Sequence, residues 1–172
     1  MGEVVSFHPG KEFKTCEKNM DAHAFRMDII RPALKVTDLW SQSAENLMLG
    51  TALAESNLDV VKQMGGGPAL SFFQIEPNTY NDVIRYLNLA RNKRLRESIL
   101  AACYTDLFPE ASCLAWNMRL ATLIARVKYW MKAESLPPPG DIEGLANYWL
   151  VHYNAGGKGT VEHFIQAWRE RA

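Results

Sequence analysis

One stretch of the sequence repeats its apolar residues with a clear helical period, and this limits the folds open to the chain. The spacings alternate between four and three, so the residues share one face of a helix. They are Trp116, Leu120, Leu123, Ile124, Val127 and Met131. We expect this face to belong to the core. Helical patterns outnumber strand patterns along the chain, which predicts a mainly α fold.

A second helix is expected from a cap at Ser41 or Ser43 to a point near Glu55. Glu45 falls in its first turn, where the helix dipole favours a carboxylate. Gly50 and nearby alanines keep one face small, so another helix can approach closely. Glu55 would end a mostly buried helix, an unusual place for a carboxylate. Residues 57–76 are expected to form a small β or loop segment after Glu55.

Further helices are expected near residues 21–30, 79–87, 92–103, 109 onward, 142–153 and 161–171. Pro32 should stop the first of them. Thr79 with Asp82 matches a capping box. Pro109 suits a first helical position, and Asp141 can cap the helix that follows the proline-rich connector.

Length and composition predict one soluble domain. The chain has 172 residues, 48% hydrophobic and 22% charged, with a formal net charge of +0. That length allows a substantial core, and we expect an N-terminal arm or loop over residues 1–20 and a single domain over 21–172. The balanced charge gives no sign of a nucleic-acid partner.

Cysteine and histidine usage predicts neither a disulfide framework nor a metal site. Three cysteines, Cys16, Cys103 and Cys113, lack paired spacing, so free thiols are expected. The histidines are scattered, and no metal or other cofactor is expected. The N-terminal sequence lacks the apolar core of a signal peptide, and no stretch is long enough to span a membrane. We therefore expect synthesis in the cytoplasm and no stable membrane insertion.

Three short motifs stand in order along the chain. They are Glu55-Ser56, the segment Ser71-Phe72-Phe73-Gln74-Ile75-Glu76-Pro77-Asn78-Thr79, and His152-Tyr153-Asn154-Ala155-Gly156. Their order resembles the lysozyme-like lytic transglycosylases, which carry Glu-Ser, Gly-Leu-Met-Gln-hydrophobic-x-Pro-x-Thr and Ala-Tyr-Asn-Ala-Gly. The resemblance covers roughly residues 41–168. It implies a lysozyme-like α-helical domain that cleaves peptidoglycan glycan strands.

The resemblance also implies roles for individual residues. Glu55 matches the catalytic acid and base, and Ser56 follows it as in the family. Gln74, Tyr153 and Asn154 match positions that contact the sugar or lie close to the catalytic carboxyl. With Glu55 as the sole catalytic group, the implied product carries a 1,6-anhydromuramic end. The sequence departs from the family at Ser71 for Gly, at Phe72-Phe73 for Leu-Met, and at His152 for Ala, which bears on substrate preference.

The chemistry agrees with an acidic residue in an apolar setting. Cleaving a glycosidic bond requires a proton on the leaving oxygen, and burial keeps a glutamate protonated near neutral pH. A conventional glycoside hydrolase needs a second carboxylate across the cleft. Asp59, Glu76 and Asp82 are the candidates, and no motif singles out one of them.

Three functions therefore stay open at this point. The first is a lytic transglycosylase, and the second is a peptidoglycan hydrolase of the lysozyme type. The third is a structural or glycan-binding component with little turnover. Without an export signal, we expect a phage enzyme for entry or lysis, or a secretion-system component. It would act on the cell wall, and virion or secretion-system proteins are the further partners expected.

Overall fold

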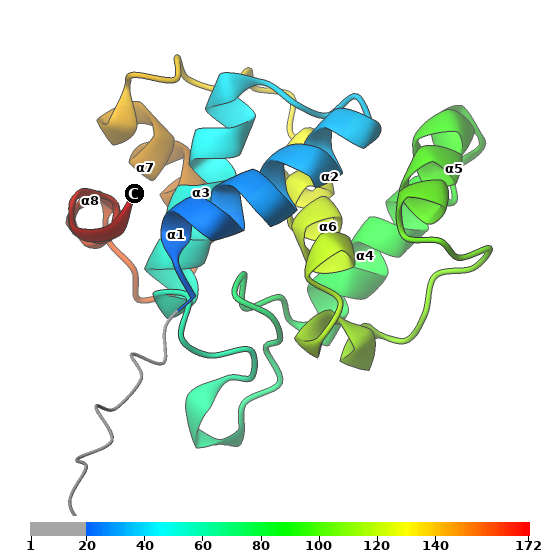
Figure 1. Cartoon of the computed structure of the whole chain (residues 1–172), viewed down its shortest axis with the longest axis horizontal. Helices are drawn as coiled ribbons and strands as arrows, with labels where there is room; N and C mark the ends of the chain where they lie inside the picture. Colours follow the sequence, from blue (N-terminus) through cyan, green and yellow to red (C-terminus); the bar gives the residue numbers. More distant parts are fainter. Residues whose placement is uncertain (1–19) are drawn as a thin grey trace, which may run out of the picture.

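The computed structural model describes residues 20–172, which are mainly helical (Figure 1). The mainly α prediction is therefore confirmed. The expectations for an N-terminal arm and for Cys16 fall outside the described residues, apart from Met20. Cys103 and Cys113 are free thiols, as expected. Between residues 20 and 172, no helix is long and apolar enough to cross a membrane.

The first helical segment runs through Pro32 rather than stopping there. It consists of α1 (Ala22–Ala24), the π-helical turn η1 (Phe25–Ile30) and α2 (Arg31–Val36). Pro32 has no N–H to donate, and it lies in the first turn of α2, directly after the wider π turn. The prediction that Pro32 ends the helix was wrong, because the local change of helix type accommodates the proline.

Helix α3 (Gln42–Ser56) lies at the centre of the fold and ends beside the candidate acid, as predicted. The Ser41 hydroxyl caps it by accepting a hydrogen bond from the Ala44 N–H at 3.0 Å. Gly50 allows the close approach expected from the sequence. A Cβ built there would lie 2.1 Å from the Phe164 ring of α8 (Val161–Arg171). Figure 1 shows α7 (Ile142–His152) and α8 on one side of α3, with α4 (Pro77–Leu87) and α5 (Lys93–Ala102) on the other.

The segment after α3 forms a loop held by isolated β-bridges. Lys62 pairs with Leu70, and Leu70 pairs with Ile75. The short turn η2 (Met64–Gly66) lies within this loop. Residues 20–172 contain no extended strand, so the segment after Glu55 is a loop with bridges.

The start of α4 differs from the sequence prediction. The helix begins at Pro77, with Glu76 in the capping position, so Thr79 lies inside the first turn. The capping box at Thr79 was therefore wrong, because Pro77 is already suited to a first helical position. Helix α5 follows a short turn, η3 (Ala90–Asn92), and agrees with the predicted range.

Helix α6 (Met118–Trp130) carries the apolar stripe that predicts the core. Four stripe residues are fully buried: Leu120, Leu123, Ile124 and Val127. Both ends of the stripe differ from the prediction, since Trp116 is 69% exposed and Met131 is 37% exposed. Pro109 does not begin a helix, because the turn η4 (Ala111–Ala115) comes next and Asn117 caps α6.

The last two helices, α7 and α8, pack against α3, the helix that carries the candidate acid Glu55. Asp141 caps α7 by accepting a hydrogen bond from the Gly144 N–H at 2.8 Å, as predicted. Helix α7 ends at His152, the first residue of the third motif. The rest of that motif, from Tyr153 to Gly156, forms a loop. Phe164 of α8 is fully buried and packs against the Trp149 ring of α7 at 5.5 Å between centroids.

Candidate active site

The three sequence motifs meet at one polar cavity of about 320 Å³. The end of α3, the turn before α4, the helix α6 and the loop after α7 each contribute to it. Its lining residues are Glu55, Gln74, Glu76, Thr79, Lys128, Tyr153, Asn154, Ala155, Gly156 and Gly157. Four of the five sequence-predicted site residues, Glu55, Gln74, Tyr153 and Asn154, are therefore brought together.

Glu55 enters this cavity from the last turn of α3. Its Oε1 accepts a hydrogen bond from the Trp149 indole Nε1 at 3.0 Å. Burial raises the pKa of the Glu55 carboxyl, while the Trp149 hydrogen bond and the positive charge of Lys128 act in the opposite direction. The raised pKa keeps the carboxyl protonated to higher pH than an ordinary glutamate. Such a group can deliver a proton and then take one back.

Lys128 is the only lysine or arginine that lines the cavity, and no sequence motif points to it. Its Nζ donates a hydrogen bond to the Tyr153 carbonyl oxygen at 2.9 Å and lies 3.7 Å from the centre of the Tyr153 ring. Burial lowers the pKa of Lys128 to about 8, although the Glu55 and Glu76 charges partly offset this. At neutral pH the ammonium is therefore charged and favours the ionised form of Glu55.

Replacing Lys128 by methionine should move the alkaline limb of the activity profile upward in pH. The variant loses the positive charge that lowers the pKa of Glu55, so the carboxyl stays protonated to higher pH. The measurement is the pH dependence of kcat/KM on soluble glycan. Lys93→Met, which removes an exposed lysine paired with Glu97 at 3.8 Å, is the matched control. An alkaline limb that stays in place or moves to lower pH in Lys128→Met would contradict this role.

Tyr153 connects the third motif to the second. Its hydroxyl donates to the Phe73 carbonyl oxygen at 2.8 Å, and the residue is only 8% exposed. Burial raises its pKa well above the ordinary value, with the Glu55 charge adding to the effect. Tyr153 is therefore a neutral hydrogen-bond donor that fixes the loop at Phe73. Its aromatic ring also forms a cation–π contact with the Lys128 ammonium.

Gln74 lies in a turn of unusual backbone geometry. Gln74 has φ 45° and Ser71 has φ 66°, both in the left-handed region that favours glycine. The Gln74 side-chain amide donates to the Ser71 carbonyl oxygen at 2.8 Å, so it holds this turn while lining the cavity. Ser71 is fully buried, and its hydroxyl accepts a hydrogen bond from the Phe73 N–H at 3.2 Å. Backbone strain of this kind is common near functional sites.

Asn154 lines the cavity beneath a glycine-rich loop. A Cβ on Gly157 would lie 1.8 Å from Asn154 Oδ1, and one on Gly159 would lie 2.3 Å from Asn154 Nδ2. A side chain at either position would therefore require the Asn154 amide to shift. The Nδ2 group is buried and has no hydrogen-bond partner within the described residues. An unpaired buried amide is a costly feature that a bound acceptor could relieve.

Ser56 and His152 lie apart from the cavity. The Ser56 hydroxyl is buried and donates to the Ala52 and Phe72 carbonyl oxygens at 3.1 and 2.8 Å. It anchors the loop that carries the second motif and is not among the cavity-lining residues. His152 packs on the Tyr148 ring at 4.3 Å between centroids, on a neighbouring part of α7.

The three candidates for a second catalytic carboxylate differ in whether they line the Glu55 cavity. Glu76 lines the same cavity as Glu55, whereas Asp59 and Asp82 do not. Asp82 forms an ion pair with Arg85 on α4. Glu76 is therefore the acidic residue best placed to act with Glu55.

Sequence reasoning missed Lys128 and the contact from Trp149. Both occupy helices whose apolar period predicts a core, so a single lysine or tryptophan there carries no separate signal. Their roles follow only from the packing of α6 and α7 against the end of α3. Among residues 20–172, no cluster of three His, Cys, Asp or Glu side chains is arranged to hold a metal ion.

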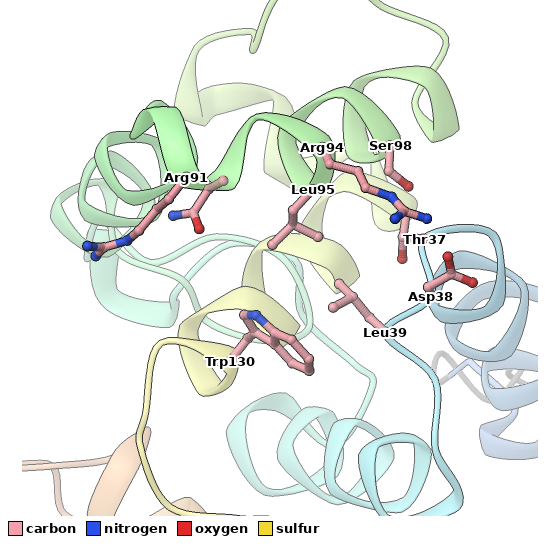
Figure 2. A pocket seen from close by; sticks show the side chains of 9 residues that line it. Thr37, Asp38, Leu39, Arg91, Arg94, Leu95, Ser98 and Trp130 are labelled. Carbon is pink, nitrogen blue, oxygen red and sulfur yellow. The ribbon is translucent and has the colours of Figure 1, made fainter.

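A separate cavity of about 440 Å³ lies between α5, the turn after α2 and the end of α6 (Figure 2). Leu39, Leu95 and Trp130 provide its apolar walls, and the Arg94 side chain extends toward Thr37. It shares no residue with the Glu55 cavity.

Comparisons with known proteins give no relative for this chain. No family model, no curated protein and no solved structure matches it.

Proposed function

We propose that the protein is a peptidoglycan lytic transglycosylase that uses Glu55 as its single catalytic acid and base. The observation that carries the proposal is the half-buried Glu55 carboxyl, with a raised pKa, in a polar cavity. The meeting of all three motif segments at that cavity supports it. The bond cleaved is the β-1,4 bond between N-acetylmuramic acid and N-acetylglucosamine.

In the proposed reaction, Glu55 first donates its proton to the glycosidic oxygen as the bond to the muramic C1 breaks. The carboxylate then accepts a proton from the muramic C6 hydroxyl as that oxygen bonds to C1. The glutamate returns to its protonated form, and one 1,6-anhydro end appears without consuming water. Lys128 favours the ionised intermediate state of Glu55, because its charge lowers the energy of a nearby carboxylate.

The other cavity residues would position the substrate. The unpaired Asn154 amide can donate to an N-acetyl carbonyl oxygen once the glycine loop is displaced. Tyr153 and Gln74 hold the turn that forms one wall, through hydrogen bonds to Phe73 and Ser71. No cofactor enters this scheme.

A hydrolase of the lysozyme type is the second candidate, because Glu76 lines the same cavity. In that case Glu76 would activate water or stabilise the charged sugar ring. Its charge also reaches Lys128, so the three ionisable groups interact.

Replacing Glu76 by glutamine separates the two candidates. We expect little change in the release of soluble fragments from purified peptidoglycan, since the transglycosylase reaction needs only Glu55. A hydrolase that depends on Glu76 would instead lose about 10²-fold or more of its rate. Asp82→Asn, which removes an exposed α4 carboxylate that does not line the cavity, is the control. A large loss confined to Glu76→Gln would overturn the single-glutamate scheme.

A further inference from the structure

The most unusual charge outside the Glu55 cavity is the buried guanidinium of Arg126. The residue is only 5% exposed, on the core helix α6. Its Nε donates to the Leu39 carbonyl oxygen at 3.2 Å, and its guanidinium lies 5.2 Å from the centre of the Trp130 ring. No carboxylate between residues 20 and 172 forms an ion pair with it.

The other charged residue that is buried within residues 20–172 is Glu45, and it is paired with Arg31 through two hydrogen bonds of 2.7 Å. A buried cation without a counter-charge is expensive, and burial lowers the pKa of Arg126 to about 10. At neutral pH the guanidinium nevertheless stays charged. The fold therefore retains a destabilising positive charge that its own described residues do not neutralise.

Arg126 borders a cavity of about 240 Å³ between the end of α6, the connector to α7 and the face of α7. Tyr129, Trp130 and Tyr148 give it aromatic walls, Leu136 adds an apolar surface, and Lys132 adds a second cation. Glu134 is the one acidic residue of the lining. A guanidinium in such surroundings suits a planar carboxylate, which can accept two parallel hydrogen bonds while apolar groups pack beside it.

The Arg126 cavity lies close to the Glu55 cavity without sharing a residue. Tyr129 lines the Arg126 cavity, and its ring packs 5.2 Å from that of Tyr153, which lines the Glu55 cavity. Arg126 and Lys128 are two residues apart on α6, so they point to different sides of the helix. One aromatic layer therefore separates a candidate glycan site from a candidate anion site.

We infer that the Arg126 cavity binds a terminal carboxylate of the peptide stems attached to the glycan strands. This inference rests on the proposed function for the choice of ligand. Peptidoglycan carries carboxylates on those stems, with small apolar side chains next to them. The aromatic and aliphatic walls match the side chains, and Arg126 matches the carboxylate.

The test is a calorimetric titration of the whole protein with a soluble stem tetrapeptide, in its free-acid form and with its carboxylates amidated. We expect the free acid to bind at least tenfold more tightly to the wild type, and this preference to disappear in Arg126→Met. Equal affinity for the two forms, or no binding of either, would overturn the inference. Competition by inorganic phosphate at equal concentration would also overturn it, by showing a general anion site.

Stability separates a binding role from a structural one. Arg126→Met removes an uncompensated buried charge at similar volume, so it should leave the denaturation midpoint unchanged or higher. A marked fall in the midpoint would mean that Arg126 serves the fold, and the inference would fail. Arg126→Lys keeps the positive charge but loses the two parallel N–H donors of the guanidinium. This variant should therefore fold normally and bind the free acid more weakly. Arg91→Met, which removes an exposed arginine of another cavity, is the control.

The outcome is independent of cleavage when the titration is repeated in Glu55→Gln. If the wild type bound the peptide but never cleaved glycan, the inference about the Arg126 cavity would stand and the proposed function would be wrong. If it cleaved glycan but showed no carboxylate-dependent peptide binding, the proposed function would stand and the inference would be wrong.

Discussion

Glu55→Gln is expected to lower the rate of glycan cleavage by about 10² to 10⁴-fold, the usual range for removal of a general acid. Glutamine has nearly the shape of glutamate and can still accept the hydrogen bond that Trp149 donates to Oε1 at 3.0 Å. It cannot give up a proton to the leaving oxygen. The measurement is the initial rate of fragment release from purified peptidoglycan at several pH values.

The same variant should be at least as stable as the wild type at pH 7. The folded-state pKa of Glu55 is raised above its ordinary value of 4.5, so the folded protein loses stability as pH rises from about 4.5 through that higher pKa. Glutamine has no such cost. The advantage of the variant should therefore vanish at acid pH, where Glu55 is protonated in both states, and thermal denaturation across pH would show it.

A loss of both activity and stability in Glu55→Gln would argue against Glu55 as the catalytic acid. If Glu55→Gln lost activity and also unfolded at much lower temperature at pH 7, Glu55 would be a structural residue. If the variant kept its rate, the proton donor would lie elsewhere in the cavity.

Glu45→Gln is expected to lower the free energy of unfolding by about 3 kcal/mol, the low end for a broken buried ion pair. The Glu45 side chain is inaccessible to solvent and accepts hydrogen bonds from Arg31 and from the Trp40 indole, the latter at 2.8 Å. Arg31 keeps 30% of its side chain exposed, and this limits the loss. Denaturant titration with an unchanged m-value measures the effect.

The pH dependence of this effect has a definite sign. Burial alone would raise the pKa of Glu45, but the bonds from Arg31 and Trp40 outweigh it and hold the pKa below 4.5. The ion pair therefore contributes its full stability above about pH 4.5 and loses it as pH falls through the lower folded pKa. The difference between wild type and Glu45→Gln should narrow in that acid range.

Glu97→Gln is the matched control, because it breaks an exposed ion pair on α5. Its carboxylate lies 3.8 Å from Lys93 Nζ, and both side chains are more than half exposed. A change of about 0.5 kcal/mol or less is expected. If Glu45→Gln were as mild as Glu97→Gln, the hydrogen bonds from Arg31 of α2 to Glu45 of α3 would contribute little to stability.

The helices could be predicted from the sequence where local signals agree. The Asp141 cap, and the Ser41 cap that was one of two alternatives, follow from side chains that satisfy nearby backbone groups, and the predicted last helix 161–171 has the observed bounds. The prediction failed at Pro32, because a π-helical turn accommodates the proline only in the folded context. The prediction also failed at Thr79, because α4 begins two residues earlier, at Pro77.

The candidate site could be predicted only in part. The motifs named Glu55, Gln74, Tyr153 and Asn154, and these four line one cavity. Lys128 carried no local signal, because its meeting with Glu55 depends on how α6 packs against α3. Ser71 adopts the left-handed backbone that favours glycine, although serine occupies the position here.

The proposed lyase reaction depends on Glu55 alone, and the masses of the released muropeptides distinguish it from hydrolysis. Purified peptidoglycan would be digested with wild type and with Glu55→Gln, and the products compared by mass spectrometry. We expect wild-type products one water lighter than hydrolytic ones, and none from the variant. Reducing-end products of hydrolytic mass would contradict the claim and make the protein a hydrolase, with Glu76 as the first residue to examine.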